Sequence, residues 1–354
     1  MIKSIKIKNY RGIKDLEIDN FKKYNFFIGD NGSKKTTVLE SIGISLSVLN
    51  FTSPLTYMLN RQIKVKNENI SSLFFNSDIN NKIEFVLKTD DDLKLGTTIS
   101  IDSILSEFQE YSSNNQIDTE IGKYLYTIRK QIEEENIQNN IYLNKKNQIF
   151  FKNFNGEEIP KNFQKIIKKY KACLHISDSF KDMREATKQI DKIIKSRKKE
   201  LLLKCLRTID KDIIDIHTND EEIFVEKDIF KEFVPISSIG DGMVLALEII
   251  IPLILTEEGF KVILIDEIER GIYYKNYRKL SEIIIELCKN NKNIQLFITS
   301  HSKEFLEAFN ETLLKNEKDN FSLFSLRNKK EKLNFVHYTS EELKDTLEMG
   351  WDPR

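Results

Sequence analysis

The chain has 354 residues, 40% of them hydrophobic, and its 55 lysines and arginines balance its 55 aspartates and glutamates. This length fits one large domain or two modest ones, and a balanced charge neither supports nor excludes a nucleic acid partner. The three cysteines are far apart and include no C-x-x-C pair, which argues against a structural zinc site or a disulfide framework. The N-terminus lacks the apolar core of a signal peptide, and the longest apolar run, 245–255, is too short to span a bilayer. We therefore expect a cytoplasmic protein without a membrane segment.

Residues 1–28 alternate between apolar and polar side chains, which predicts two or three strands with a turn at 10–12. The last apolar run of this region enters a Gly-rich turn, and a helix-forming run, 35–49, follows. In the phosphate-loop pattern G-x-x-x-x-G-K-[ST], Gly29 takes the first glycine, Lys35 the lysine and Thr36 the hydroxyl. Backbone N–H groups and the helix N-terminus of such a loop hold phosphates, while its lysine and hydroxyl serve the terminal phosphates and Mg²⁺.

The predicted nucleotide contacts cover the whole loop and one residue before it. Those in the loop are Asp30, Asn31, Gly32, Ser33, Lys34, Lys35, Thr36 and Thr37. Arg11 lies in the turn at 10–12, where it either contacts the nucleotide or is a solvated turn residue. The alternative for the whole stretch is an ordinary strand, turn and helix with a lysine pair.

The loop departs from the pattern at Lys34, where a glycine is expected. A lysine there costs about 1–3 kcal/mol of strain if its φ is positive, although it adds a positive charge near the phosphates. The sequence therefore indicates nucleotide binding more strongly than turnover.

The middle of the chain has weaker patterns. Residues 50–72 lack clear periodicity, and the polar segment 103–146 is weakly periodic, which predicts helix within an insertion reaching residue 170. The other predicted elements are a hairpin of strands 82–88 and 97–101, a short strand in 147–160, helices 163–170 and 180–209, and strands 213–216 and 223–225. The helix 180–209 is basic, which favours a solvated face, with a docking surface for nucleic acid or an acidic partner as the alternative.

The last third begins with a polar Gly turn and an apolar helix over 235–255, for which Ser238 and Asp241 are both suitable N-cap residues. An apolar strand, 261–265, then ends in Asp266 and Glu267. A continuous apolar run is typical of a parallel strand buried on both faces, whose carboxyl end lies at the ligand edge of the sheet. A helix, 276–290, leads to another strand, 294–299, and the tail predicts a hairpin over 321–338 and a short helix.

These strand ends supply the groups that a phosphate loop needs. Asp266 would bind Mg²⁺ together with Thr36, and Glu267 would polarise the attacking water as a general base. His301, which follows the strand 294–299, would sense or stabilise the γ-phosphate. The alternatives are an acidic pair that starts a helix and a histidine that caps one.

Four motifs in order make a family resemblance. GDNGSKKTT looks like a Walker A motif, SSIGDGMVLALEI like a variant signature motif, VILIDEIERGIYY like Walker B with a D-loop, and ITSHSKEF like a switch-histidine strand. The set resembles the ABC-type ATPases of the SMC/RecF and OLD group. Within that group it is most similar to the compact AAA-type ATP-binding proteins of bacterial anti-phage defence, such as the ATPase subunit of the PARIS system. The resemblance covers about the first 45 residues and the chain from residue 170 onward.

The resemblance implies an α/β fold, an ABC-type P-loop head with a mixed, mainly parallel central sheet. An antiparallel N-terminal β region and a helical insertion complete the expected architecture. The expected segments are an N-terminal lobe, 1–102, the insertion, 103–170, and a C-terminal lobe, 171–354.

The resemblance also implies an ATPase that uses ATP and Mg²⁺ and forms a homo-oligomer through the nucleotide. In that family the signature motif, here Ser238, Gly240 and Asp241, contacts the nucleotide of the neighbouring subunit. A separate nuclease or toxin is the expected effector, because no TOPRIM-like carboxylate cluster follows the motifs. Two alternatives stay open: a nucleotide-stabilised scaffold with little hydrolysis, and a DNA-repair or DNA-tethering ATPase.

Overall fold

The computed structural model describes residues 1–66, 68–102, 125–143, 149–152, 159–170, 172–176, 183–219, 221–229, 232–255, 259–289, 291–315, 317–329 and 332–354. The chain forms two compact units. Unit 1 comprises Met1–Lys22, Asp30–Cys173 and Leu326–Phe335, and unit 2 comprises Lys23–Gly29, Leu174–Ser325 and Val336–Arg354. Among the described residues, no helix is both long and apolar enough to cross a membrane.

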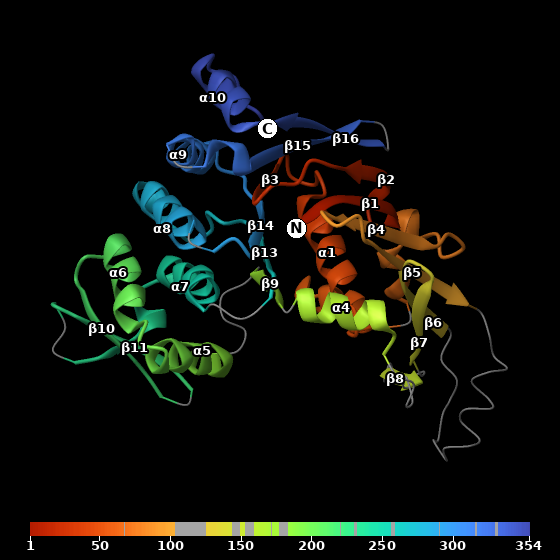
Figure 1. Cartoon of the computed structure of the whole chain (residues 1–354), viewed down its shortest axis with the longest axis horizontal. Coiled ribbons are helices and arrows are strands. Elements are labelled where there is room, and N and C mark those ends of the chain that lie inside the picture. Colours follow the sequence, from red (N-terminus) through yellow and green to blue (C-terminus); the bar gives the residue numbers. More distant parts are fainter. Residues whose placement is uncertain are drawn as a thin grey trace. The chain divides into compact units, whose positions relative to one another are not determined.

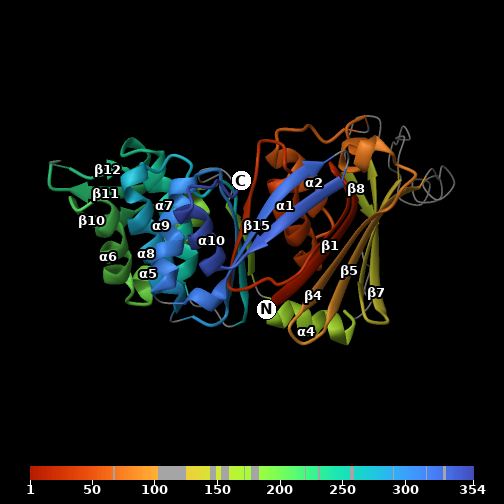
Figure 2. The same ribbon diagram turned by 90° about the horizontal axis from the view of Figure 1, so that it is seen from above.

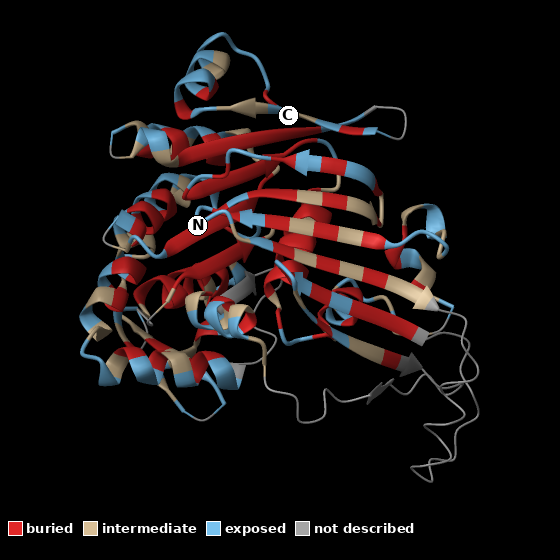
Figure 3. Cartoon of the chain, turned by 45° about the vertical axis from the view of Figure 1, so that its right-hand side comes forward, coloured by how far each residue is buried: buried red, intermediate tan, exposed pale blue. Residues whose placement is uncertain are grey.

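Unit 1 is built on a seven-stranded antiparallel sheet in the order β2-β1-β4-β5-β6-β7-β8. Its strands are β1 (Ile2–Tyr10), β2 (Ile13–Ile18), β4 (Ile83–Thr89), β5 (Lys94–Asp102), β6 (Leu125–Ile132), β7 (Glu135–Leu143) and β8 (Ile149–Lys152). Burial alternates along these strands, as Figure 3 shows, because one face of the sheet packs on the core and the other meets solvent.

The helix α1 (Lys35–Leu46) covers the inner face of this sheet and contacts β1, β4 and β5 (Figure 2). The other helices of unit 1 are α2 (Ser53–Asn60), α4 (Lys161–Lys169) and the 3₁₀ segments Ile70–Leu73 and Phe75–Ser77. All residues of α1 except Thr36 are buried, so this helix is the centre of the unit 1 core.

A six-stranded sheet in the order β16-β15-β3-β14-β13-β9 supplies the strands of unit 2 that carry the predicted motifs. The strands are β3 (Tyr24–Ile28), β9 (Ala172–Ile176), β13 (Lys261–Ile265), β14 (Ile294–Thr299), β15 (Phe321–Lys329) and β16 (Lys332–Tyr338). The pairs β13–β14, β14–β3 and β3–β15 are parallel. Every residue of β3, β13 and β14 is buried, which explains their continuous apolar sequences.

Helices line one side of β13, β14 and β3 (Figure 1). They are α7 (Asp241–Ile254), α8 (Tyr277–Lys289), α9 (Lys303–Leu314) and α10 (Ser340–Glu348), each in contact with the next. Beyond α7 lie α5 (Met183–Lys195) and α6 (Lys199–Ile209), packed on a small sheet of β10 (Ile213–Thr218), β11 (Ile223–Lys227) and β12 (Val234–Pro235). Short 3₁₀ segments lie at Ile236–Ser238, Tyr274–Asn276 and Lys318–Asn320.

Most of the predicted elements are confirmed, including the α/β class, three N-terminal strands, the hairpin of β4 and β5, and β14 over 294–299. The helix predicted for 103–146 is wrong where β6 and β7 lie, while 103–124 and 144–146 fall outside the described residues. On the buried face of β6 Lys130 separates Ile128 from Ile132, and on that of β7 Asn139 separates Ile137 from Ile141. Ile128 and Ile132, like Ile137 and Ile141, are therefore spaced by four, which is the spacing of a helix face.

Three smaller predictions also need correction. The region 50–72 contains α2, and β9 was not predicted at all. The helix predicted for 180–209 is two helices, interrupted where Arg197 has φ 58°. The three sequence segments, 1–102, 103–170 and 171–354, stay a prediction about how the chain is organised.

Lys130 is a charged side chain inside the unit 1 core. It is 3% exposed, and its Nζ donates to the carbonyl of Ile44 in α1 and, over 3.1 Å, to Oγ1 of Thr97. Burial lowers its pKa from 10.5 to about 7. Between these two pH values the unfolded chain binds a proton that the folded chain does not, so stability rises with pH across this window.

We expect the pH dependence of stability to change in Lys130→Met. The wild type should gain up to about 1.4 kcal/mol of unfolding free energy per pH unit between about pH 7 and 10, relative to Lys130→Met. Urea unfolding of both proteins across this range measures the difference. Lys88→Met removes an exposed lysine of β4 and should keep the wild-type slope. Equal slopes in the wild type and Lys130→Met would contradict the assignment.

Candidate functional site

The phosphate loop, residues 29–36, connects β3 to α1 and contains three positive-φ residues. They are Gly29 (φ 137°), Gly32 (φ 79°) and Lys34 (φ 70°). Lys34 therefore adopts the left-handed conformation that the pattern reserves for glycine, at a cost of about 1–3 kcal/mol. It is also the N-cap residue of α1 and makes no side-chain cap hydrogen bond. The loop thus leads directly into the N-terminus of a helix, whose partial positive charge favours an anion.

The two lysines of the loop point to different places. Lys35 is 6% exposed, and its Nζ donates to the carbonyl of Asp30 over 3.1 Å and to Oγ of Ser33 over 3.3 Å. Its ammonium group is therefore enclosed by the loop itself. Lys34 instead lies over the backbone of Gly12, where an added Cβ would be 2.2 Å from its Cε. Asp30, Asn31 and Gly32 form the exposed tip of the loop.

Arg11 and Thr37 belong to a buried ionic network. Glu40 of α1 is 1% exposed. It forms an ion pair with Nε of Arg11 at 3.2 Å and accepts a hydrogen bond from Nε of Arg61 over 2.7 Å. Nη2 of Arg61 also donates to Oγ1 of Thr37 over 3.3 Å. The side chain of Arg11 is 9% exposed, so the alternative of a solvated turn residue is wrong. Burial acts to lower the pKa of Arg11, but Tyr10 and Glu40 outweigh it and the pKa is raised, which keeps Arg11 cationic.

In unit 2 the carboxylates Asp266 and Glu267 lie where β13 ends. Thr299, the last residue of the neighbouring β14, donates its hydroxyl to Oδ1 of Asp266 over 2.6 Å and accepts the N–H of Glu267 over 2.8 Å. Glu267 has φ 54°, a strained conformation for a residue other than glycine. No helix begins at this pair, since bends and turns occupy residues 266–271 and the next helical segment begins at Tyr274. The acidic pair is therefore not a helix start.

His301 follows β14 at the same edge, and its Nε2 is 3.9 Å from Oε1 of Glu267. The residue that caps α9 is Ser302, whose side chain accepts from the N–H of Phe305, so the alternative of a capping histidine is wrong. Ser300 donates its N–H to the carbonyl of Phe27 in β3 over 3.2 Å. Because β13, β14 and β3 are parallel neighbours, Gly29, Asp266 and His301 emerge at one edge of the sheet.

A protein family shares this sequence organisation. The family model described as "AAA domain, putative AbiEii toxin, Type IV TA system" matches residues 24–307. The chain belongs to this family.

Two individual proteins resemble this AAA domain protein over most of their length. A Helicobacter pylori protein named "ATP/GTP phosphatase" is 30% identical over 346 residues, which is 90% of each chain. Among solved structures, the SMC head domain from Thermotoga maritima matches with a TM-score of 0.45 and 12% identity, covering 95% of this chain and 98% of that one.

In this AAA domain protein the predicted signature motif forms a turn, residues 238–242, at the start of α7. The N-cap of α7 is Gly240 (φ 129°) and lacks a side-chain cap, so neither Ser238 nor Asp241 is the predicted N-cap. The hydroxyl of Ser238 donates instead to the carbonyl of Pro235 over 2.6 Å. Gly242 lets the D-loop, residues 269–273, approach closely, since an added Cβ would lie 2.3 Å from the carbonyl oxygen of Gly271. The fold thus brings the signature turn and the D-loop together.

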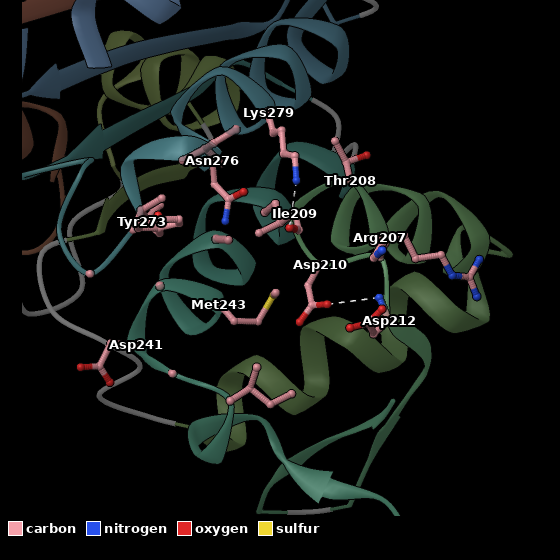
Figure 4. Close-up of a pocket in the computed structure, with 18 residues that line it drawn as sticks. Arg207, Thr208, Ile209, Asp210, Asp212, Asp241, Met243, Tyr273, Asn276 and Lys279 are labelled. Atoms are coloured by element: carbon pink, nitrogen blue, oxygen red, sulfur yellow. Dashed lines mark hydrogen bonds between the residues drawn. The ribbon is translucent and has the colours of Figure 1, made fainter. Parts of the chain in front are cut away.

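A pocket of about 560 Å³ opens beside this contact (Figure 4). Gly240, Asp241 and Gly242 of the signature turn and Gly271 and Tyr273 of the D-loop contribute to its lining, but Ser238 does not. Its opposite wall is the corner between α6 and β10, residues 207–212. Because the residues of this wall match none of the four motifs, the wall could not be identified from the sequence.

The residues of the candidate site that could not be found from the sequence are mostly partners of the predicted ones. Thr299 holds the carboxylate of Asp266 and the backbone N–H of Glu267, Glu40 pairs with Arg11, and Glu269 accepts the N–H of His301 over 2.5 Å. The second carboxylate oxygen of Glu269 is buried and has no hydrogen-bond partner among the described residues. Of these residues, only Thr299 could have been found from the sequence, because it ends the apolar strand that follows the predicted Walker B strand.

We expect Glu40→Gln to destabilise the protein strongly, because it leaves Arg11 and Arg61 without their shared carboxylate. Breaking such a buried ionic network costs about 3–5 kcal/mol. The unfolding free energy in urea measures this loss. Glu17→Gln, which removes an exposed partner of Lys6, is the matched control and should cost less than about 1 kcal/mol. Similar values for the two variants would show that the network contributes little.

Proposed function

We propose that the chain is a Mg²⁺-dependent ATPase that binds ATP at the phosphate loop. One observation carries the proposal: the parallel strands β3, β14 and β13 present Gly29, His301 and the Asp266–Glu267 pair at one sheet edge. The AAA domain family supports it, and so does the name of the Helicobacter pylori relative, an ATP/GTP phosphatase.

The proposed binding roles follow from the chemistry of each group. The loop residues 30–37 hold the phosphates through backbone N–H groups and the α1 N-terminus, and Lys35 supplies positive charge to the terminal phosphates. Arg11, a buried cation in the turn between β1 and β2, is a further proposed phosphate contact. Thr36 and Asp266 offer the hydroxyl and carboxylate oxygens that Mg²⁺ prefers, and Thr299 fixes the Asp266 carboxylate for that purpose. When bound, Mg²⁺ would neutralise charge on the phosphates.

Glu267 and His301 carry the proposed catalytic roles. Glu267 accepts a proton from the attacking water as a general base, and its side chain is 48% exposed at the strand edge. His301 lies 3.9 Å from it and stabilises the γ-phosphate as charge develops. The strained backbone of Glu267 supports the assignment, because such strain is concentrated at functional sites.

The proposed assembly is a homo-oligomer joined through ATP, in which Ser238, Gly240 and Asp241 contact the nucleotide of a second copy. Gly240 and Asp241 are exposed at a helix N-terminus without a side-chain cap, an arrangement that favours phosphate. The family description names a toxin system, which supports a separate toxin or nuclease as effector. We extend the proposal to cytoplasmic anti-phage defence of the PARIS kind, with the nucleotide state controlling that effector.

Two alternative functions differ in what they require. A nucleotide-stabilised scaffold with slow hydrolysis is favoured by the left-handed Lys34. A DNA-tethering ATPase would need a free basic surface, but much of the basic helix region is engaged within the chain. Lys199 pairs with Asp215, Lys204 pairs with Glu286, and Arg207 donates to the carbonyls of Ile213 and Ile214. ATP hydrolysis assayed with and without DNA separates these functions.

We expect Glu267→Gln to keep ATP binding and to slow hydrolysis by roughly 10²- to 10⁴-fold, because the amide cannot accept the proton of water. Phosphate release measures the rate, and sizing with ATP and Mg²⁺ should show the trapped oligomer. Glu282→Gln removes an exposed carboxylate of α8 and should hydrolyse ATP like the wild type. An unchanged rate in Glu267→Gln would remove Glu267 from the role of base.

A further inference from the structure

The backbone of His301 is held on both sides by side chains that are distant in sequence. Its N–H donates to Oε1 of Glu269 over 2.5 Å. Its carbonyl oxygen accepts from Nη1 of Arg354 over 2.7 Å. The two peptide groups that flank His301 are therefore both fixed, so the imidazole retains only its own side-chain rotations.

Arg354 is itself held in place by Asp352. Nε of Arg354 lies 2.9 Å from Oδ1 and 3.0 Å from Oδ2 of Asp352, and Nη2 lies 2.5 Å from Oδ2. The hydrogen bonds from Arg354 are the main reason that the pKa of Asp352 falls to about 2. The pair is therefore ionised at neutral pH, and Nη1 donates to the carbonyl of His301.

The turn after α10 aims this segment at His301. The helix ends at Gly350, which has φ 76°. The N–H of Gly350 donates to the carbonyl of Leu347, and the N–H of Trp351 donates to the carbonyl of Thr346. This is the Schellman pattern of helix termination, which reverses the chain direction. Pro353 is buried, so the segment is anchored between Asp352 and Arg354.

We propose that residues 352–354, the C-terminal strap, are a positioning element for His301 in the ATPase reaction. The strap sets the backbone from which the imidazole meets Glu267, whose Oε1 lies 3.9 Å from Nε2. Arg354 acts through His301, so it is a positioning residue and not a catalytic one. The inference rests on the proposed ATPase function, and it adds a second element, distant from the motifs, on which turnover depends.

The first test is steady-state ATP hydrolysis by the full chain with Mg²⁺. Arg354→Ala should lower kcat by about 10- to 100-fold, the scale of a small misplacement of a catalytic group, with ATP affinity by calorimetry unchanged. The kcat of Arg354→Lys should lie between those of the wild type and Arg354→Ala. The lysine ammonium can donate to the carbonyl of His301, but it cannot pair with both carboxylate oxygens of Asp352 as the guanidinium does. Millimolar guanidinium chloride should restore part of the activity of Arg354→Ala, whereas sodium chloride should not.

Lys318→Ala is the matched control, because Lys318 and Glu341 form an exposed ion pair at 2.8 Å in the same unit, away from His301. It should keep the wild-type kcat. An unchanged kcat in Arg354→Ala overturns the inference, and so does a loss of kcat that neither lysine nor guanidinium repairs. If the wild type hydrolyses ATP and Glu267→Gln does not, the proposed ATPase function holds. Either of these results for Arg354→Ala then contradicts only the positioning role of the strap.

A second measurement is independent of activity. The chain has four histidines, so the ring nitrogen signals of His301 can be assigned in NMR spectra with His301→Gln. Arg354→Ala should shift or broaden the signals of His301, and Lys318→Ala should not. Unchanged His301 signals in Arg354→Ala overturn the inference even if the wild type shows no hydrolysis.

Discussion

The parallel pairing of β13, β14 and β3 is the constraint on which the site depends. Parallel strands place their carboxyl ends at one edge, so a short strand that ends in Asp266 and one that ends in Thr299 deliver both side chains to the same place. The hydrogen bond of 2.6 Å between Thr299 and Asp266 records that register directly. Because all residues of the three strands are buried, a shift in register would disrupt the packing of the core and would also move Asp266 away from Thr299.

Within unit 1, buried ionisable side chains hold the helix that follows the phosphate loop. Glu40 connects the middle of α1 to Arg11 and Arg61, and Lys130 donates to the carbonyl of Ile44 in its last turn. These contacts fix the direction of α1, and thereby the position of the N-terminus that we propose to meet phosphate. Burying the ionised groups of Glu40 and Arg11 is costly in desolvation, and the pairing of the Glu40 carboxylate with two arginines offsets part of this cost.

The strength of the local signal decided what the sequence could predict. Continuous apolar runs predicted β13 and β14 correctly to the residue, which placed Asp266 after the first strand and His301 after the second. The strands β6 and β7 were missed because Lys130 and Asn139 occupy inward positions and leave a helical spacing. The contacts of His301 could not be predicted, since Glu269 and Arg354 lie 32 and 53 residues away and meet it only through the fold. The sequence predicted that Lys34 would be strained if its φ were positive, and the structure shows that it is positive.

Calorimetric titration of ATP with Mg²⁺ into the wild type and Lys35→Ala tests the central claim most directly. Lys35 is enclosed by the loop, so its removal takes away the positive charge proposed to meet the terminal phosphates. Lys14→Ala removes an exposed lysine of β2 and serves as the control. The account predicts that the wild type and Lys14→Ala bind ATP alike and that Lys35→Ala loses most of the affinity. Equal dissociation constants for the wild type and Lys35→Ala would contradict the claim that this loop is the nucleotide site.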